Sequence, residues 1–216
     1  LRDLIPEWAE AVTFSDEKVT NFDAVIATGS NNTARYFEYY FGKKPHIIRK
    51  NRNSVAVLTG KETQEELIAL GKDIFQYYGL GCRSISKLFV PENYSFDAFF
   101  QAIYAYWDII NEQKYANNYD YNKAVYLMSL YKLLENGFLI LKEDKSYASP
   151  IATLFYEYYT DTEALKKQLI TDTEQIQCVV AKGLLPDEIA FGNTQIPQLW
   201  EYADNVDTLK FLSNLG

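Results

Sequence analysis

Cys82 has the strongest chemical signal of any residue in this chain. It follows two glycines in the run YGLGCR at residues 78–83. Glycines let a substrate approach the backbone, an adjacent cation favours the reactive thiolate, and backbone N–H groups of such a turn could hold an oxyanion. The alternative is a buried, inert cysteine, a common fate of this residue. For Cys178, inside the apolar run IQCVV, the inert interpretation is favoured.

A second candidate site follows the short apolar run FDAVIA at residues 22–27. Thr28, Gly29 and Ser30 close that run, and a helical pattern begins at Asn31. A strand, a small-residue turn and a helix start in this order can present N–H groups to a phosphate. The run matches neither G-x-G-x-x-G nor a P-loop, so an ordinary capped helix is the alternative.

His46 is the only histidine. Its ordinary pKa range suits acid/base catalysis, although a structural role beside apolar residues is the alternative. The basic run RKNR at residues 49–52 could hold a phosphate-bearing cofactor or coenzyme A, or it could form a solvated loop. With one histidine and no C-x-x-C motif, no metal site is expected.

The elements that must position these residues alternate along the chain. Periodicity and turn signals predict strands at 22–27, 54–58, 85–90, 137–141, 151–158 and 176–181, and helices at 31–41, 63–78, 96–110 and 162–172. Residues 115–122 are polar and turn-prone, residues 123–134 could be helical, and the tail at 191–212 is irregular and then helical. This alternation indicates an α/β fold with a largely parallel sheet, divided near the basic stretch at 43–52.

Composition excludes several classes of function. The chain has 216 residues and a formal net charge of -8, with no basic stripe of the kind that binds nucleic acid. No apolar run reaches the roughly 18 residues of a membrane span. Two cysteines far apart form no disulfide framework, which predicts a reducing cytoplasm. The chain begins at Leu1, so an N-terminal portion is expected to be missing.

Five segments together resemble the acyl-CoA reductase family known from bacterial bioluminescence, within the aldehyde dehydrogenase superfamily. They occur in the order that the family shows, and they cover most of the chain. The matching segments are FDAVIATGSNNTA (22–34), PHIIRKNRNSVAVL (45–58), YYGLGCRSISKLFVP (77–91), KYANNYDYNKA (114–124) and FGNTQIPQLWEYADNVDTLKFL (191–212).

The resemblance implies a fold, an activity and particular roles for several residues and for the two parts of the chain. Cys82 would take an acyl group from a long-chain acyl-CoA, and NADPH would reduce the acyl-enzyme to a fatty aldehyde. Thr28, Gly29 and Ser30 match the turn beside the nicotinamide cofactor, and the Phe-Gly pair at 191–192 matches a late loop that closes over the active site. Residues 1–43 would be a remnant of the cofactor domain and residues 44–216 the catalytic domain, with possible homo-oligomer formation.

Two departures from the family pattern matter. The superfamily's general-base glutamate would fall near residues 47–50, where no glutamate occurs. Reductive release of the acyl group is therefore favoured over hydrolysis, and His46 lies close to that position. The N-terminal half that the family carries is also missing. Two alternatives stay open: another aldehyde dehydrogenase-type activity, on an aldehyde or an acyl-phosphate, and a non-catalytic binding module that retains the fold.

Overall fold

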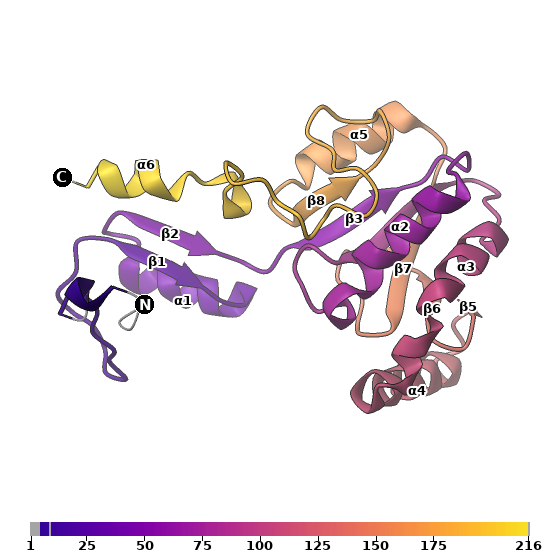
Figure 1. The fold of residues 1–216 in the computed structure, drawn as a ribbon, viewed down its shortest axis with the longest axis horizontal. Coiled ribbons are helices and arrows are strands. Elements are labelled where there is room, and N and C mark those ends of the chain that lie inside the picture. The colour runs from indigo at the N-terminus through magenta and orange to yellow at the C-terminus, as the bar shows by residue number, and fades with distance from the viewer. Residues whose placement is uncertain (1–4, 9, 216) are drawn as a thin grey trace. The chain divides into compact units, whose positions relative to one another are not determined.

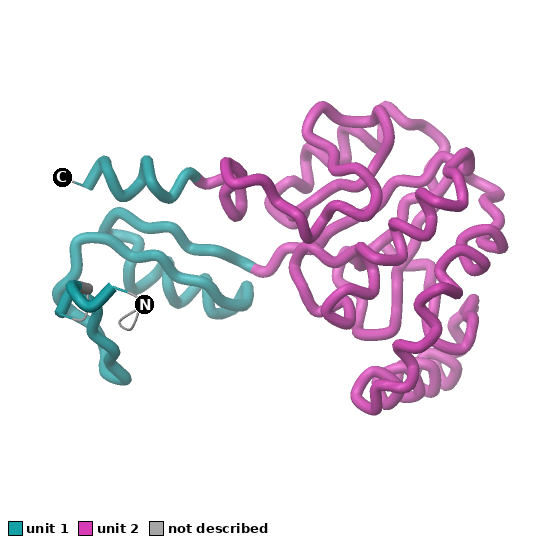
Figure 2. The backbone as a smooth tube through the Cα atoms, in the orientation of Figure 1, with its two compact units in different colours: residues 1–50, 207–216 teal, residues 51–206 magenta. Residues whose placement is uncertain are grey.

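The chain forms two compact units, which Figure 2 distinguishes by colour. The structure, a computed structural model, describes residues 5–8 and 10–215. Unit 1 consists of residues 1–50 and 207–216, and unit 2 of residues 51–206.

Unit 1 is built on two parallel strands and the helix that connects them (Figure 1). Strand β1 (Val25–Thr28) pairs with β2 (His46–Arg49), and helix α1 (Asn31–Phe41) lies between them in sequence. A short 3₁₀ segment (Pro6–Trp8) and helix α6 (Thr208–Ser213) complete the unit. The helix predicted at 31–41 is confirmed, but β2 was not among the expected strands.

Contacts from β2 explain why unit 1 extends past residue 43. The strand pairs with β1 along its whole length, and the Arg49 guanidinium donates a hydrogen bond of 3.2 Å to Thr208 Oγ1 in α6. Pairing and side-chain contact thus bring residues 44–50 and the C-terminal helix into this unit. The cofactor-binding and catalytic roles expected for the two parts of the chain stay predictions.

A six-stranded, largely parallel sheet forms the framework of unit 2. Its order is β5-β6-β7-β4-β3-β8, with only the β5–β6 pair antiparallel among the described strands. The strands are β3 (Asn53–Val57), β4 (Ile85–Pro91), β5 (Leu133–Glu135), β6 (Ile140–Glu143), β7 (Thr153–Tyr159) and β8 (Ile176–Val180). The predicted α/β class with a mostly parallel sheet is confirmed.

Helices cover both faces of this sheet. The helical elements of unit 2 are α2 (Gln64–Phe75), a 3₁₀ segment (Gln76–Gly79), α3 (Asp97–Ile103), a 3₁₀ segment (Tyr104–Asn111), α4 (Gln113–Met128), α5 (Thr162–Thr171) and a 3₁₀ segment (Ala203–Asn205).

Among the described helices, none is both long and apolar enough to cross a membrane.

Alternation along β3 divides the core between the two faces. Ala56 and Leu58 join the cluster packed against α2 and α3, whereas Val55 and Val57 join the cluster packed against α5. Successive side chains of a strand point to opposite faces, so a continuous apolar run is what a strand covered on both sides requires.

Helix α4 corrects the prediction that residues 115–122 are turn-prone. Tyr115, Tyr119 and Asn122 are buried on one face of this helix. The Tyr115 hydroxyl donates to the Phe138 carbonyl at 3.0 Å, and Asn122 Nδ2 donates to the Ile151 carbonyl at 2.8 Å. The segment looks polar in sequence because its buried face carries groups that satisfy their hydrogen bonds inside the protein.

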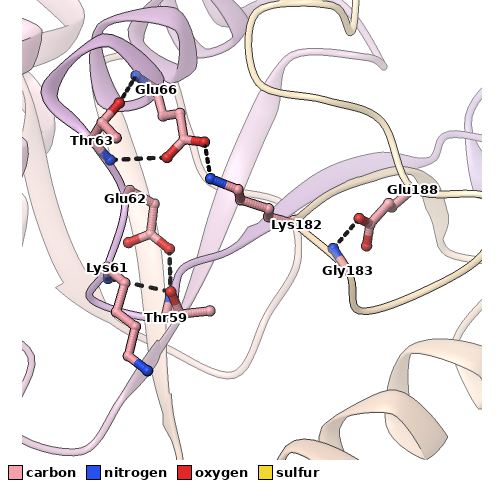
Figure 3. Close-up of polar contacts among 8 residues, drawn as sticks. All are labelled: Thr59, Lys61, Glu62, Thr63, Glu66, Lys182, Gly183 and Glu188. Atoms are coloured by element: carbon pink, nitrogen blue, oxygen red, sulfur yellow. Dashed lines mark hydrogen bonds and ion pairs between the residues drawn. The ribbon is translucent and has the colours of Figure 1, made fainter.

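Polar side chains bridge the segments that follow β3 and β8 (Figure 3). Thr63 and Glu66 form a capping box at the start of α2, and Glu66 also pairs with Lys182, beyond β8, at 2.6 Å. Glu62 accepts from the backbone N–H of Thr59 at 2.6 Å and from its hydroxyl at 2.7 Å. These contacts occupy the edge of the sheet where β3 and β8 end.

A fully buried lysine in β4 provides a test of this packing. Lys87 Nζ lies 2.6 Å from Glu157 Oε2 of β7, and the Lys87 side chain has no exposed surface. Removing one partner of an ion pair costs most when the charge left behind is buried, and replacing both partners by apolar groups is often neutral. Glu157→Ala leaves the fully buried Lys87 ammonium without its carboxylate, and we expect it to lower the free energy of unfolding by about 3 kcal/mol. Lys87→Met leaves a carboxylate whose side chain is 25% exposed and can be hydrated, so the loss should be smaller, about 1 kcal/mol.

Urea denaturation of the two single variants and of the double variant measures these effects. The double variant should be more stable than Glu157→Ala alone, because it no longer contains a buried ammonium group without its carboxylate; the Lys145 carbonyl, at 2.8 Å, is the partner that remains in Glu157→Ala. Equal stability of the two would show that the lysine charge is not the source of the loss.

Candidate active site

Cys82 lies in an exposed turn that leads into β4. The backbone N–H of Ser84 donates to the Gly81 carbonyl at 2.9 Å, so Cys82 and Arg83 occupy the two central positions of a β-turn. The Cys82 residue is exposed. A nucleophile must be reachable by its substrate, and this position satisfies that requirement.

The approach to this turn uses an uncommon backbone conformation. Tyr77, Tyr78 and Gly79 follow one another with φ values of 56°, 60° and 73°. Only glycine adopts this left-handed region without a penalty, which for other residues is about 1–2 kcal/mol each. Backbone strain of this kind clusters at functional sites.

The turn is anchored through the Cys82 carbonyl, while three of its backbone N–H groups have no acceptor among the described residues. The Ser54 hydroxyl in β3 donates to the Cys82 carbonyl at 2.9 Å. Within the part of the chain that the structure describes, the backbone N–H groups of Gly81, Cys82 and Arg83 donate no hydrogen bond. Free N–H groups beside a thiol are what an oxyanion would bind, as the sequence predicts.

The Arg83 guanidinium is held by the segment that follows β8. Its Nε donates to the Thr194 carbonyl, and a terminal nitrogen lies 3.8 Å from Glu201 Oε2. Burial raises the pKa of Cys178, and the Arg83 charge acts in the opposite direction. Cys178 is only 5% exposed, which agrees with the inert role that its apolar surroundings predict.

Residues before and after Cys82 line two separate cavities. One, of about 480 Å³, has an aromatic and apolar wall formed by Tyr78, Leu80, Tyr115 and Ile151. The other, of about 640 Å³, is lined by Arg83 and by residues of β8 and the segments around it. Volumes of a few hundred Å³ are typical of ligand pockets. The two cavities therefore border residues that precede and follow the thiol-bearing residue, while Cys82 itself is in neither lining.

A buried carboxylate in α2 holds the loop at residues 191–195, hereafter the 191–195 loop. Asp73 accepts hydrogen bonds from the backbone N–H groups of Gly192 at 2.6 Å and Thr194 at 3.0 Å. Sequence reasoning missed Asp73. Its signal was a charge on the apolar face of the helix, one turn after Leu70 and next to Ile74.

Unit 1 contains the other predicted site residues and brings Arg49 of the basic run next to the turn at residues 28–30. Thr28 ends β1, the Gly29 N–H donates to the Arg49 carbonyl at 3.2 Å, and Ser30 caps α1 by accepting from Thr33 N at 3.2 Å. Thr28 is paired with Arg49. The turn of residues 28–30 thus lies beside Arg49, part of the basic run considered as a phosphate-binding segment.

His46 lies at the other end of the same strand pair, where it is paired with Val25. Val25 and Thr28 are three steps apart along the strand, or roughly 10 Å. The exposed His46 ring contacts the Lys44 carbonyl through Nδ1 at 2.8 Å. Because a carbonyl only accepts, Nδ1 carries the proton, and Nε2 of the neutral ring is available as a base. The structure does not bring His46 next to residues 28–30.

Among the described residues, no group of three or more His, Cys, Asp or Glu side chains could hold a metal ion.

Solved aldehyde dehydrogenases share this fold over about three quarters of the chain. The structure superposes on Delta-pyrroline-5-carboxylate dehydrogenase from Mycobacterium tuberculosis bound with NAD, with a TM-score of 0.51, 16% identity, and coverage of 73% of this chain and 36% of that one. For the aldehyde dehydrogenase KauB from Pseudomonas aeruginosa the TM-score is 0.52, the identity 14%, and the coverage 74% and 40%. No family model and no curated protein matches the sequence.

A third example is the NAD-dependent aldehyde dehydrogenase from Sinorhizobium meliloti, with a TM-score of 0.52, 14% identity, and coverage of 74% of this chain and 38% of that one. The chain spans less than half the length of these proteins. Likeness at this level of identity establishes the aldehyde dehydrogenase-like fold, and activity has to be argued from the site.

The left-handed backbone before Cys82 generates a stability prediction. Tyr77 is 63% exposed, so replacing it removes little packing. We expect Tyr77→Gly to raise the free energy of unfolding by about 0.5–1 kcal/mol, because relief of the left-handed penalty exceeds the entropic cost of glycine.

The matched control is Tyr121→Gly, at a position of α4 that is 68% exposed. There glycine should lower the free energy of unfolding by about 1 kcal/mol. Chemical denaturation of both variants gives the comparison. Equal destabilisation by the two replacements would show that residue 77 is not strained.

Proposed function

We propose that the chain is part of a nicotinamide-dependent oxidoreductase that reduces a long-chain acyl-CoA to a fatty aldehyde through an acyl group on Cys82. The observation that carries this proposal is the exposed thiol in a turn whose neighbouring N–H groups donate to no described residue. The aldehyde dehydrogenase-like fold supports oxidoreductase chemistry, and the family resemblance of the sequence supplies the substrate.

The acyl transfer needs only groups that surround Cys82. The thiolate attacks the thioester carbonyl, a new C–S bond forms, and coenzyme A leaves as its thiolate and takes up a proton. The carbonyl oxygen becomes negative in the intermediate, and the free N–H groups of Gly81, Cys82 and Arg83 suit that charge. Two cavities beside the turn suit a reaction in which two ligands meet at one carbon.

The turn at residues 28–30 fits a phosphate-bearing cofactor. Ser30 caps an 11-residue helix whose first turn has no acidic side chain, and Arg49 is paired with Thr28. A helix N-terminus with a nearby cation attracts phosphate. NADPH, when bound, supplies the hydride that releases the acyl group as aldehyde. His46 is proposed as an acid/base group through its Nε2 atom, and the cytoplasm is proposed as the location.

Acyl transfer to Cys82 is tested in the full-length enzyme with radiolabelled long-chain acyl-CoA and no nicotinamide cofactor. Cys82→Ala should abolish the label, whereas the control Cys178→Ala should retain it, because that thiol is buried. NADPH added to the labelled enzyme should release the label as aldehyde. Undiminished label on Cys82→Ala, or release only as free acid, would contradict the proposal.

The turn at residues 28–30 is tested by adding a charge without removing the cap. Aspartate caps helices as well as serine does, so Ser30→Asp should preserve stability while repelling a phosphate. We expect the KM for NADPH to rise about tenfold or more, with acyl labelling of Cys82 unchanged. Ser30→Asn, which caps without charge, is the control and should keep a nearly normal KM. An equal KM in both variants would remove residues 28–30 from the cofactor site.

A further inference from the structure

We propose that Asp73 is a positioning residue for the chemistry at Cys82: its buried carboxylate fixes the 191–195 loop, and that loop holds the turn that carries the thiol. The inference rests on the proposed function, because it assigns the residue to the reaction of that same thiol. Asp73 itself touches no reacting atom and acts through the loop.

The carboxylate of Asp73 is saturated by the loop. It is 1% exposed and accepts from Gly192 N at 2.6 Å, Thr194 N at 3.0 Å and Thr194 Oγ1 at 2.8 Å. Burial raises the pKa of the Asp73 carboxyl, and these hydrogen bonds act in the opposite direction. Burying a carboxylate is costly unless donors surround it, and here the donors all come from one loop.

The loop is also packed tightly against α2. Gly192 has a φ of 84°, and a Cβ atom at this position would lie 3.0 Å from the Ala69 side chain. The chain can pass this close to the helix only as glycine in the left-handed region. Hydrogen bonds and steric fit therefore give the loop one position relative to α2.

From that position the loop contacts the two residues that follow Cys82 and lies close to Gly81, which precedes it. The Thr194 carbonyl accepts from Arg83 Nε, and Gln195 Nε2 donates to Ser84 Oγ at 3.5 Å. A Cβ atom at Gly81 would lie 3.5 Å from Gln195 Nε2. The contacts link Asp73 to the turn through Thr194, which binds the carboxylate with its N–H and hydroxyl and Arg83 with its carbonyl.

Only a carboxylate satisfies all of these donors. An asparagine at position 73 would turn an NH₂ group toward one of them, most directly the Gly192 N–H, and leave that donor unpaired. The loop would then shift, and the turn would lose its support. A displacement of about 1 Å of a reacting group can slow a reaction about 100-fold.

The test measures acylation of Cys82 in the full-length enzyme by rapid mixing with long-chain acyl-CoA. Asp73→Asn should lower the rate constant at saturating acyl-CoA about tenfold or more, with the half-saturating concentration nearly unchanged, because the substrate-binding surfaces remain. Thr194→Val, which loses the hydroxyl but keeps both backbone contacts, should give a smaller decrease. The double variant should be no slower than Asp73→Asn, since both residues act through the hydrogen bonds between the Asp73 carboxylate and Thr194.

A control variant separates positioning from general destabilisation. Tyr147→Phe removes a hydrogen bond to Asp172 in the core on the α5 side of the sheet. It should lower the melting temperature without slowing acylation. The inference is overturned if Asp73→Asn and Thr194→Val acylate at the wild-type rate, or if Tyr147→Phe slows acylation equally at the same loss of stability.

A second readout keeps the inference distinct from the proposed function. If wild-type Cys82 takes up no acyl group, the proposed function fails. Alkylation of Cys82 by iodoacetamide still reports the position of the thiol, and its rate should change at least threefold in Asp73→Asn and remain unchanged in Tyr147→Phe. An unchanged alkylation rate in a folded Asp73→Asn variant overturns the positioning role whatever the natural substrate is.

Discussion

Between α2 and β4 the chain reverses direction over residues 76–84, and the candidate site depends on how it does so. A helix that ends and a strand that begins on the same edge of the sheet leave little room for the connection. Left-handed backbone at Tyr77, Tyr78 and Gly79 makes the reversal, and the β-turn that follows presents Cys82 to solvent. The strain of two left-handed tyrosines is balanced by anchors on both sides, at Ser54 and in the 191–195 loop.

This geometry places Cys82 at the edge of the sheet where the parallel strands begin. Ligands of open α/β sheets usually bind where the strands end. In unit 2 that other edge is occupied beyond β3 and β8 by the network around Glu62, Glu66 and Lys182. The fold therefore uses one edge for packing, and the loops of the other edge form cavities lined by residues that flank Cys82 in sequence.

Local patterns in the sequence predict most of the elements but extend two helices too far. Helix α2 ends at Phe75, before the left-handed residues that the predicted helix at 63–78 included. Helix α4 ends at Met128, and the segment considered helical up to residue 134 ends in β5. Ser30 and Thr63 cap their helices where the sequence indicates, and glycines mark the turn before Cys82, because caps and tight turns depend on a few neighbouring residues. Contacts between distant segments escape such patterns. The links of Asp73 to Thr194 and of Arg49 to Thr208 join segments more than 100 residues apart, so the role of the Asp73 carboxylate and the place of the C-terminal helix in unit 1 emerge only from the fold.

The supports of the two candidate sites come from different units. Ser54, Asp73 and Thr194, which hold the Cys82 turn, belong to unit 2, whereas the turn at residues 28–30 is held by Arg49 and Thr33 of unit 1. In the proposed reaction these supports correspond to two steps, acyl transfer to sulfur and hydride transfer to the acyl carbon. Because the two sets of contacts share no residue, a change in one set can alter its own step while the other keeps its geometry. For this reason a charge introduced at Ser30 is expected to change cofactor affinity. The loss of charge at Asp73 is expected to change the rate of acylation instead.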